Sequence, residues 1–350
     1  MSLDAAAAPG ALMATEIAEQ PSVLDRILTR SNPDIADIVA RIRKVAPKFV
    51  ILAARGTSDH AALYAKYLLE IRLGLPCGLA SPSTMTTYGA RPDLRDVLFI
   101  SVSQSGGSPD LVESMTTARS CGALTLAVTN APQSPLAAAA ELHLDVKAGP
   151  ERAVAATKSY TAELLSLYLL IDALAGGDGA AARSLPHAVA ATLVNASSIG
   201  QIAVAHADTD RIIATGRGYS YPTAREAALK LMETSYIAAS AFSGADLLHG
   251  PLAMVTTGSA VITVVPDGRG GAAMQPVLER LREVSADLIV IGSAANVDGH
   301  SGVVLPSGLD EQVSPIVEIV PLQVLARELA VARGFDPDRP RGLKKVTETW

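Results

Sequence analysis

The chain has 350 residues, 49% of them hydrophobic, so it can bury the cores of one large or two medium domains. Its net charge of −6 argues against a nucleic-acid or membrane-surface binder, because neither polyanion is attracted by the average field, and an anionic ligand would need a local trap. Cys77 and Cys121 lie far apart without a Cys/His cluster, which predicts neither a disulfide framework nor a metal site and fits a reducing cytoplasm.

The first half alternates short apolar runs with longer segments of helical spacing, the pattern of a parallel sheet covered by helices. After a mobile tail at 1–12 and linker helices at 13–45, we expect strands at 49–54, 97–102 and 124–129, and helices at 60–74, 109–122 and 161–175. The helix at 161–175 is almost wholly apolar and is expected to be buried. A Gly- and Ala-rich linker at 176–184 precedes a further helix from 186 to 205.

The second half repeats this order. It has expected strands at 211–216, 260–266 and 287–292, and expected helices at 222–239, 274–286 and 319–334. We therefore predict an α/β protein of two tandem units, each a parallel sheet flanked by helices in a three-layer, flavodoxin-like αβα arrangement. The units are assigned to 46–176 and 206–334, with a linker and helix at 177–205 and a C-terminal tail at 335–350 that closes over the site. No apolar run reaches the roughly 20 residues of a membrane helix.

The strand at 97–102 runs into SQSGGSPD and then a helix. This places four polar side chains around a glycine pair at the carboxyl end of a parallel strand: Ser103, Gln104, Ser105 and Ser108. Ligands bind at such strand ends, and a helix N-terminus with converging amides favours a phosphate. An ordinary turn would also use Ser, Gly and Pro, but four polar side chains in six positions favour a phosphate cradle. The turn after 49–54 offers a second wall through Thr57 and Ser58.

The helix at 222–239 carries Glu226, Lys230 and Glu233 at i, i+4 and i+7, so the three share one face. Spacing alone favours a solvated or salt-bridged face. His249 lies in a His-Gly-Pro turn, where a lone histidine is more often a packing or capping residue than a catalytic one. A chemical role for either group needs further support.

That support comes from a resemblance. The segments RGTSDHA, SVSQSGGSPD, ERAVAATKSY, GRGYSYPTAREAALKLMETSYI, LLHGPLAMV and DRPRGLKKVT look like the SIS (sugar isomerase) family, and specifically the isomerase half of glutamine:fructose-6-phosphate aminotransferase. The likeness runs from about residue 13 to the end of the chain. It implies two tandem SIS domains, a sugar-phosphate substrate, no cofactor and no metal.

The resemblance also implies roles for particular residues. Glu233 matches the carboxylate that shuttles a proton, His249 the histidine that opens the sugar ring from the neighbouring subunit of a homodimer, and Lys345 a lysine near the sugar carbonyl, with its neighbour Lys344 blurring the register. The expected phosphate ligands are Thr57, Ser58, Ser103, Gln104, Ser105 and Ser108, and the expected sugar contacts are Val154, Ala155, Thr157 and Lys230. The chain departs from the synthase pattern at Ala156, which replaces a serine, and at Gly107, which replaces a glutamate.

The synthases carry a glutaminase domain whose cysteine follows the initiator Met, whereas Ser2 follows it here. The resemblance thus points to the stand-alone relatives, and the ending GLKKVTET is closer to theirs. We expect a cytoplasmic glucosamine-6-phosphate deaminase that releases fructose 6-phosphate and ammonia. Two alternatives stay open: the same chemistry as ammonia-dependent amination or as a deglycase of another amino-sugar or fructosamine phosphate, and a non-catalytic sugar-phosphate sensor.

Overall fold

The computed structural model describes residues 8–30 and 32–345. Three helices come first: α1 (Ala11–Ala18), α2 (Gln20–Arg30) and α3 (Asn32–Val45). The first half then contains β1 (Phe49–Ala53), α4 (Thr57–Leu73), β2 (Cys77–Leu79), α5 (Ser83–Thr86), β3 (Val97–Ser103), α6 (Pro109–Ser120), β4 (Leu124–Thr129), α7 (Pro135–Ala139), β5 (Leu142–Asp145) and α8 (Lys158–Leu174).

The second half is built from the same kinds of element. After α9 (Leu185–Asn195) and α10 (Ile199–Ala205) come β6 (Arg211–Gly216), α11 (Tyr221–Ser235), β7 (Ala238–Ser243), α12 (Gly244–Leu248), β8 (Ala260–Val265), α13 (Arg269–Ala272), α14 (Gln275–Glu283), β9 (Asp287–Gly292), α15 (Ala294–Val297), β10 (Ser301–Val304) and α16 (Ser314–Ala332).

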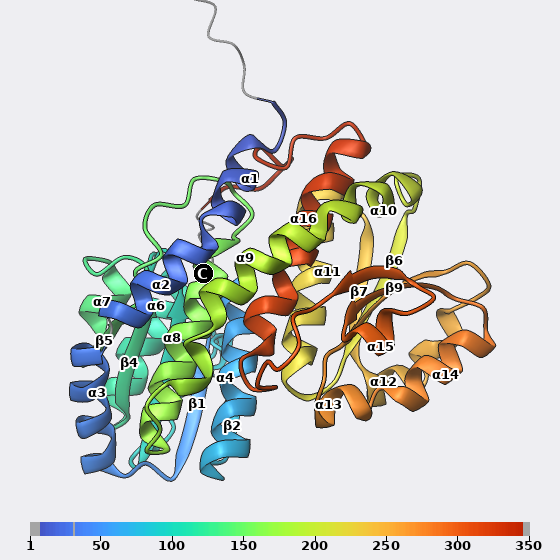
Figure 1. The fold of residues 1–350 in the computed structure, drawn as a ribbon. Coiled ribbons are helices and arrows are strands. Elements are labelled where there is room, and N and C mark those ends of the chain that lie inside the picture. Colours follow the sequence, from blue (N-terminus) through green and yellow to red (C-terminus); the bar gives the residue numbers. More distant parts are fainter. Residues whose placement is uncertain (1–7, 31, 346–350) are drawn as a thin grey trace, which may run out of the picture.

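Each half contains a five-stranded parallel sheet. The first has the order β2-β1-β3-β4-β5, and the second has the order β10-β9-β8-β6-β7. If the strands of each half are counted from its own first strand, the second sheet read from its β7 edge has the same order as the first sheet read from its β2 edge. The two halves therefore share one flavodoxin-like topology. Figure 1 shows the sheets side by side, in blue to green and in yellow to orange. The predicted fold class of two tandem three-layer α/β units is confirmed.

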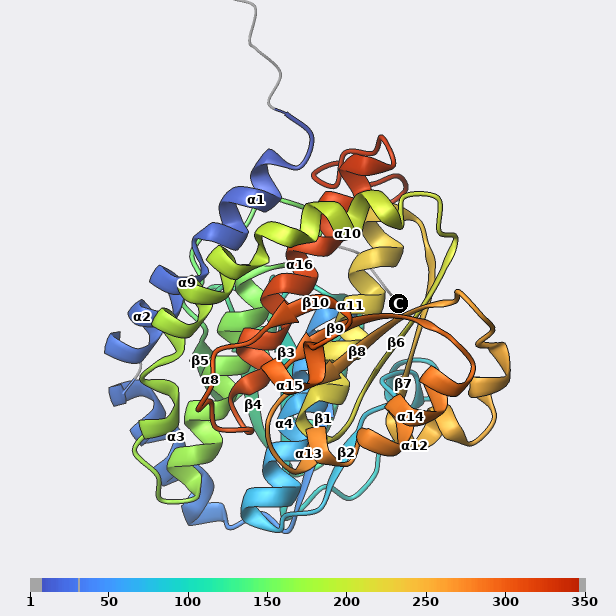
Figure 2. The ribbon, with the colours of Figure 1, turned by 45° about the vertical axis from the view of Figure 1, so that its right-hand side comes forward.

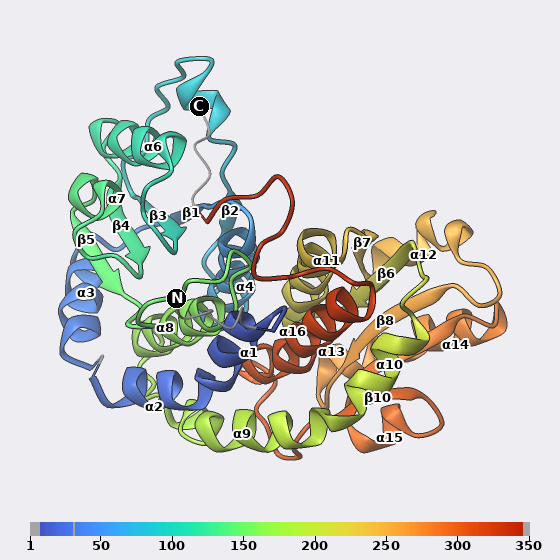
Figure 3. The same ribbon diagram turned by 90° about the horizontal axis from the view of Figure 1, so that it is seen from above.

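Helices that face one another join the halves. α4 and α8 cover one face of the first sheet, α11 and α16 cover the facing side of the second, and α11 packs against both α4 and α16. Seen from above in Figure 3, these helices form a central layer between the sheets. The largest apolar cluster runs through this layer, whereas one smaller cluster lies under the outer helices of the first sheet and another under those of the second. The expected burial of the helix at 161–175 agrees with α8.

Three predicted helices differ from those observed. The helix expected over 222–239 ends at Ser235, because Tyr236 adopts the left-handed conformation with φ 55°, and residues from Ala238 onward form strand β7 instead. The helix expected over 186–205 is divided by a short 3-10 turn at Ala196–Ser198. α16 begins at Ser314, before the apolar run that predicted it.

The two ends of the described chain meet. The Gly10 N–H donates to Asp336 Oδ1 at 3.0 Å, and the Leu12 and Met13 N–H groups donate to the Asp338 carboxylate at 2.8 Å each. These carboxylates bind the free amides of the first turn of α1. Part of the segment expected as a mobile tail, from residue 8 to 12, is therefore held; residues 1–7 and 346–350 lie outside the described residues.

The helical segment Ala180–Ala205 has the length and apolar composition of a membrane span, with a mean hydropathy of 1.5. It includes the 3-10 turn and two separate helices, α9 and α10. Both pack against α16, and α9 also packs against α2 (Figure 2). We interpret this segment as a covering layer over the junction of the two halves, since core helices meet the same length and composition test.

Candidate active site

The loops that follow β1 and β3 meet where the order of the first sheet reverses. β1 leads outward to β2 on one side, whereas β3 leads to β4 and β5 on the other. Ligands in open parallel sheets lie outside the carboxyl ends of the strands at such a point. A cleft of about 300 Å³ opens there, lined by both loops, the segment before α8, the helices α8 and α11, and the C-terminal tail.

The loop after β3 folds around its own serine. The Ser103 Oγ accepts a hydrogen bond from the Gly106 N–H at 3.2 Å. Gly106 has φ 60°, and a Cβ at this position would lie 2.2 Å from the Ser134 Oγ, so glycine is required. Ser108 stands at the N-cap position of α6 in an extended conformation, and its hydroxyl makes no capping hydrogen bond. The small side chains thus bring a helix N-terminus, with its free amides and dipole, to the edge of the cleft.

Arg55, which the sequence analysis did not single out, places a cation beside this loop. Arg55 follows β1, lines the cleft and pairs with Asp110 in the first turn of α6, with 2.8 Å between Nη2 and Oδ2. Asp110 is buried, whereas the Arg55 side chain is 45% exposed. The ion pair ties the β1 loop to the start of α6, and it places the donor N–H groups of the Arg55 guanidinium at the cleft, where the phosphate is predicted, with its charge balanced by Asp110.

The opposite wall carries a row of charges on α11, of which Glu226 and Lys230 are buried and Glu233 is partly exposed. Lys230 is 1% exposed and pairs with Glu226 at 3.4 Å and with Glu233, its neighbour toward the cleft. Burial alone would lower the pKa of Lys230, but the carboxylates of Glu226 and Glu233 raise it above its usual value. Glu226 also accepts a hydrogen bond from the Thr57 hydroxyl at 3.0 Å and lies 2.7 Å from His60 Nδ1. The row couples the second half to the loop after β1.

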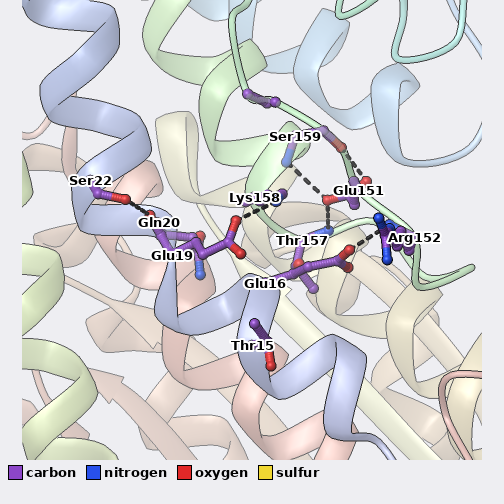
Figure 4. A network of polar contacts seen from close by, with 12 residues as sticks. Thr15, Glu16, Glu19, Gln20, Ser22, Glu151, Arg152, Thr157, Lys158 and Ser159 are labelled. Carbon is purple, nitrogen blue, oxygen red and sulfur yellow. Dashed lines mark hydrogen bonds and ion pairs between the residues drawn. The ribbon is translucent and has the colours of Figure 1, made fainter.

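The C-terminal tail lines one side of the cleft and is held there by Lys345. Its ammonium donates to Glu151 Oε2 at 2.8 Å and to the Ala153 carbonyl at 2.7 Å. Figure 4 shows Glu151 at the centre of a network with Thr157 and Ser159, which donate to it. Burial would raise the pKa of Glu151, but Lys345 and the hydrogen bonds from Ser159 hold it below its usual value. The tail is therefore fastened to a buried carboxylate.

A second contact fixes the tail farther back. The Arg341 N–H donates to the Tyr236 hydroxyl at 2.7 Å, and the Arg341 guanidinium lies 4.1 Å above the Tyr236 ring. Tyr236 ends α11, the helix that carries Glu233. The tail thus contacts both α11, which carries the candidate catalytic residue Glu233, and the loop before α8.

Most of the sequence-predicted residues come together in this cleft. Its lining includes Thr57, Ser58, Ser103, Gln104, Ser105, Ser108, Val154, Lys230, Glu233 and Lys345. Ala155 and Thr157 are 1% and 0% exposed and lie behind the lining, while Ala156 faces the cleft. His249 is exposed at the end of α12 and does not line the cleft of its own chain.

Sequence reasoning missed one buried acid in the same cleft. Glu163 lies on α8, is 1% exposed and belongs to the cleft lining. Its signal in the sequence was a carboxylate in the middle of a largely apolar helix, where a charge is costly unless it is partnered or used. A second carboxylate, Asp172, lies near the end of the same helix and pairs with Arg72. Among the described residues, no group of three or more His, Cys, Asp or Glu side chains could hold a metal ion.

The corresponding place in the second half is filled by the protein itself. The second sheet reverses its order between β6 and β8. There, the carboxylate of Glu311 accepts hydrogen bonds from the Arg269 N–H at 3.0 Å and the Gly270 N–H at 2.5 Å, at the start of α13. An internal anion therefore lies where the first half has an open cleft, and the halves are not equivalent.

The comparisons with known proteins agree with this architecture. The SIS domain family model matches residues 46–173 and again 206–332. The chain therefore belongs to the SIS domain family and carries two copies of the domain, as the sequence motifs predicted.

Individual relatives show which branch of the family the chain resembles. A glutamine–fructose-6-phosphate aminotransferase of Pseudomonas putida is 35% identical, over 95% of this chain and 58% of that protein, so the chain spans somewhat more than half of that relative. The C-terminal domain of a glucosamine-fructose-6-phosphate aminotransferase from Francisella tularensis superposes with a TM-score of 0.86 and 29% identity, over 94% of this chain and 98% of that one. The chain is thus homologous to the isomerase part of these aminotransferases.

A glucosamine-6-phosphate deaminase from Thermotoga maritima shares the fold. Its TM-score is 0.74 at 22% identity, over 97% of this chain and all of that one. This likeness extends along the entire two-domain architecture.

Proposed function

We propose that this chain is a phosphosugar isomerase that acts as a glucosamine-6-phosphate deaminase. One observation carries the proposal: Glu233 on the second half and the serine loop after β3 on the first half line the same cleft. A phosphate held by that loop would place the sugar carbons across the cleft, toward α11. The homology to the isomerase part of the aminotransferases supports the same class of substrate.

The chemistry proceeds in three stages. After the ring opens, Glu233 takes the proton from C2 of the amino-aldose and returns it to C1, while a proton of the C2 amino group passes to O1, so that the aldehyde becomes a hydroxymethyl group and C2 becomes an imine. Water then adds to C2, and ammonia leaves as the C2 ketone forms. The Lys230 ammonium, in contact with Glu233, orients this carboxylate as it gains and loses the proton.

Ring opening is assigned to His249 of a second subunit. The side chain is exposed in this chain and lies outside its own cleft, as a residue donated across an interface would. A homodimer would then be required for activity, and this can be tested by co-expressing Glu233→Gln with His249→Ala. Random pairing restores about a quarter of the wild-type sites if His249 acts across the interface. If His249 acts within its own chain, no activity returns.

The direct test is ammonia release. Purified protein incubated with glucosamine 6-phosphate should form ammonia and fructose 6-phosphate in equal amounts, and Glu233→Gln should reduce kcat by at least about a hundredfold. Wild-type release no faster than that of the variant would refute the proposal.

A substrate panel separates the rival assignments. Fructose 6-phosphate with ammonia, other 2-amino-sugar phosphates and fructosamine phosphates should be ranked by kcat/KM. A deglycase would prefer the fructosamine phosphate, and an aminating enzyme would consume ammonia. Binding without turnover of any compound would identify a sensor, an outcome that Glu233 and Lys345 in the cleft oppose.

A further inference from the structure

Glu163 is anchored at the cleft by one of its two oxygens. The Ser58 hydroxyl donates to Glu163 Oε1 at 2.9 Å, and both side chains line the cleft. Ser58 is itself buried in the first turn of α4, so it holds the carboxyl in one orientation. The other oxygen, Oε2, is buried and has no hydrogen-bond partner among the described residues.

A carboxylate with one unpaired buried oxygen is costly in its ionised form, whereas a protonated oxygen needs only one acceptor. The surroundings of Glu163 include groups that raise its pKa and groups that lower it. Together they raise the pKa of Glu163 to about 8: burial is the largest cause, the carboxylates of Glu151 and Glu226 act in the same direction, and Ser58 and Lys345 oppose the rise. Burial raises the pKa of Tyr160, on the same helix, well above its usual value, so this group adds no charge near Glu163 in the neutral and mildly alkaline range.

We propose that Glu163 is a substrate-contacting residue that keeps a proton on Oε2 and donates it in a hydrogen bond to an oxygen of the bound phosphosugar. The proposal rests on the proposed function, because it takes the cleft to be the phosphosugar site. It makes Glu163 a neutral donor in a cleft built for an anion, where an ionised carboxylate would repel the ligand.

This role predicts a loss of affinity in alkaline solution. When Glu163 ionises, the donor is replaced by a negative charge beside the phosphate loop, and only the protonated fraction binds well. The apparent Kd then rises about tenfold between pH 7 and pH 9 for a group with a pKa of about 8. Glutamine at the same position would keep an N–H donor and would not titrate.

The experiment measures the Kd of sorbitol 6-phosphate by calorimetry from pH 6.5 to pH 9. This probe has no carbonyl and cannot be isomerised, so binding is measured whether or not the protein releases ammonia. The variant Glu163→Gln should bind with a nearly constant Kd above pH 7, and Glu163→Leu should bind about tenfold more weakly than wild type at pH 7, since it lacks the donor. Glu233→Gln, which removes the other acid of the cleft lining, should keep the alkaline rise.

Three results would overturn the proposal. They are an equal alkaline rise in wild type and Glu163→Gln, unchanged affinity of Glu163→Leu at pH 7, and no binding of sorbitol 6-phosphate by wild type. A role limited to orienting Ser58 would give the first result, because that role does not depend on a titrating proton. Failure of the deaminase assay alone, with the pH-dependent binding intact, would refute the proposed reaction and leave this inference standing.

Discussion

Replacing Lys230 by methionine should destabilise the protein through the carboxylate that it leaves behind. Lys230 and Glu226 are 1% and 0% exposed, so removal of the ammonium leaves a charge that water does not reach. Removing one member of such a pair costs about 3–5 kcal/mol. Glu226 keeps its contacts with Thr57 and His60, and Glu233 is 22% exposed and can be hydrated, so the lower figure of about 3 kcal/mol applies.

The reasoning requires that a second change relieve the first. In the double variant Glu226→Gln with Lys230→Met, no fully buried unpaired charge remains on α11, since Glu233 is partly exposed, and the free energy of unfolding should recover by at least about 1 kcal/mol relative to Lys230→Met alone. Urea denaturation followed by far-ultraviolet circular dichroism measures each variant. A matched control is Lys66→Met, which breaks a partly exposed pair with Glu70 and should change stability by less than about 0.5 kcal/mol. If the double variant is as unstable as Lys230→Met, or more so, the uncompensated charge is not the cause.

Three further outcomes follow from particular contacts. Gly106→Ala should lower stability by about 1–3 kcal/mol and weaken fructose 6-phosphate binding in calorimetry, because its Cβ meets Ser134; unchanged affinity would contradict this. Lys345→Gln should speed amide hydrogen exchange at residues 341–345, because it removes the ion pair with Glu151; equal exchange in variant and wild type would show that the tail is held by other contacts. Burial raises the pKa of Glu318 to about 7, so its folded state binds the proton more tightly and stability falls as pH rises from about 4.5 to 7, by up to about 1.4 kcal/mol per pH unit. In urea titrations Glu318→Gln should show a shallower fall over that range, and an identical slope would contradict the assignment.

The interior strands were predictable because each is an uninterrupted apolar run, as a parallel strand covered on both faces must be. The edge strands were not. β2 and β10 are short, contain glycine and are partly exposed, and β7 reads AASAFS, whose alanines resemble a continuing helix. Tyr236 ends α11 in a left-handed conformation that favours glycine or asparagine, so nothing local announced the end of the helix.

The candidate site likewise has a part that could be predicted from the sequence and a part that could not. The serine loop could be predicted because a strand, a glycine pair and a helix start are adjacent in the sequence. The loop before α8 could not be placed in detail, because it is a series of bends with no regular period to show which side chains face the cleft. Val154 and Ala156 line the cleft, and Ala155 and Thr157 are buried behind the lining. The importance of Glu163 depends on Ser58, which is distant in sequence, and so appears only in the folded chain.

The carboxylate of Glu311 gives the two halves different responses to ligand. In the second half the amides at the start of α13 already bind an anion that is part of the chain, so this half carries its stabilising ligand at all times. Under the proposed function, the equivalent amides of the first half would meet an anion only when a phosphosugar binds, and the resulting stabilisation would grow with ligand concentration as RT ln(1 + [L]/Kd). Because α11 of the second half also lines the cleft, a bound phosphosugar would stabilise the loops of the first half together with their packing against α11, whereas the anion site at α13 is filled at every substrate concentration.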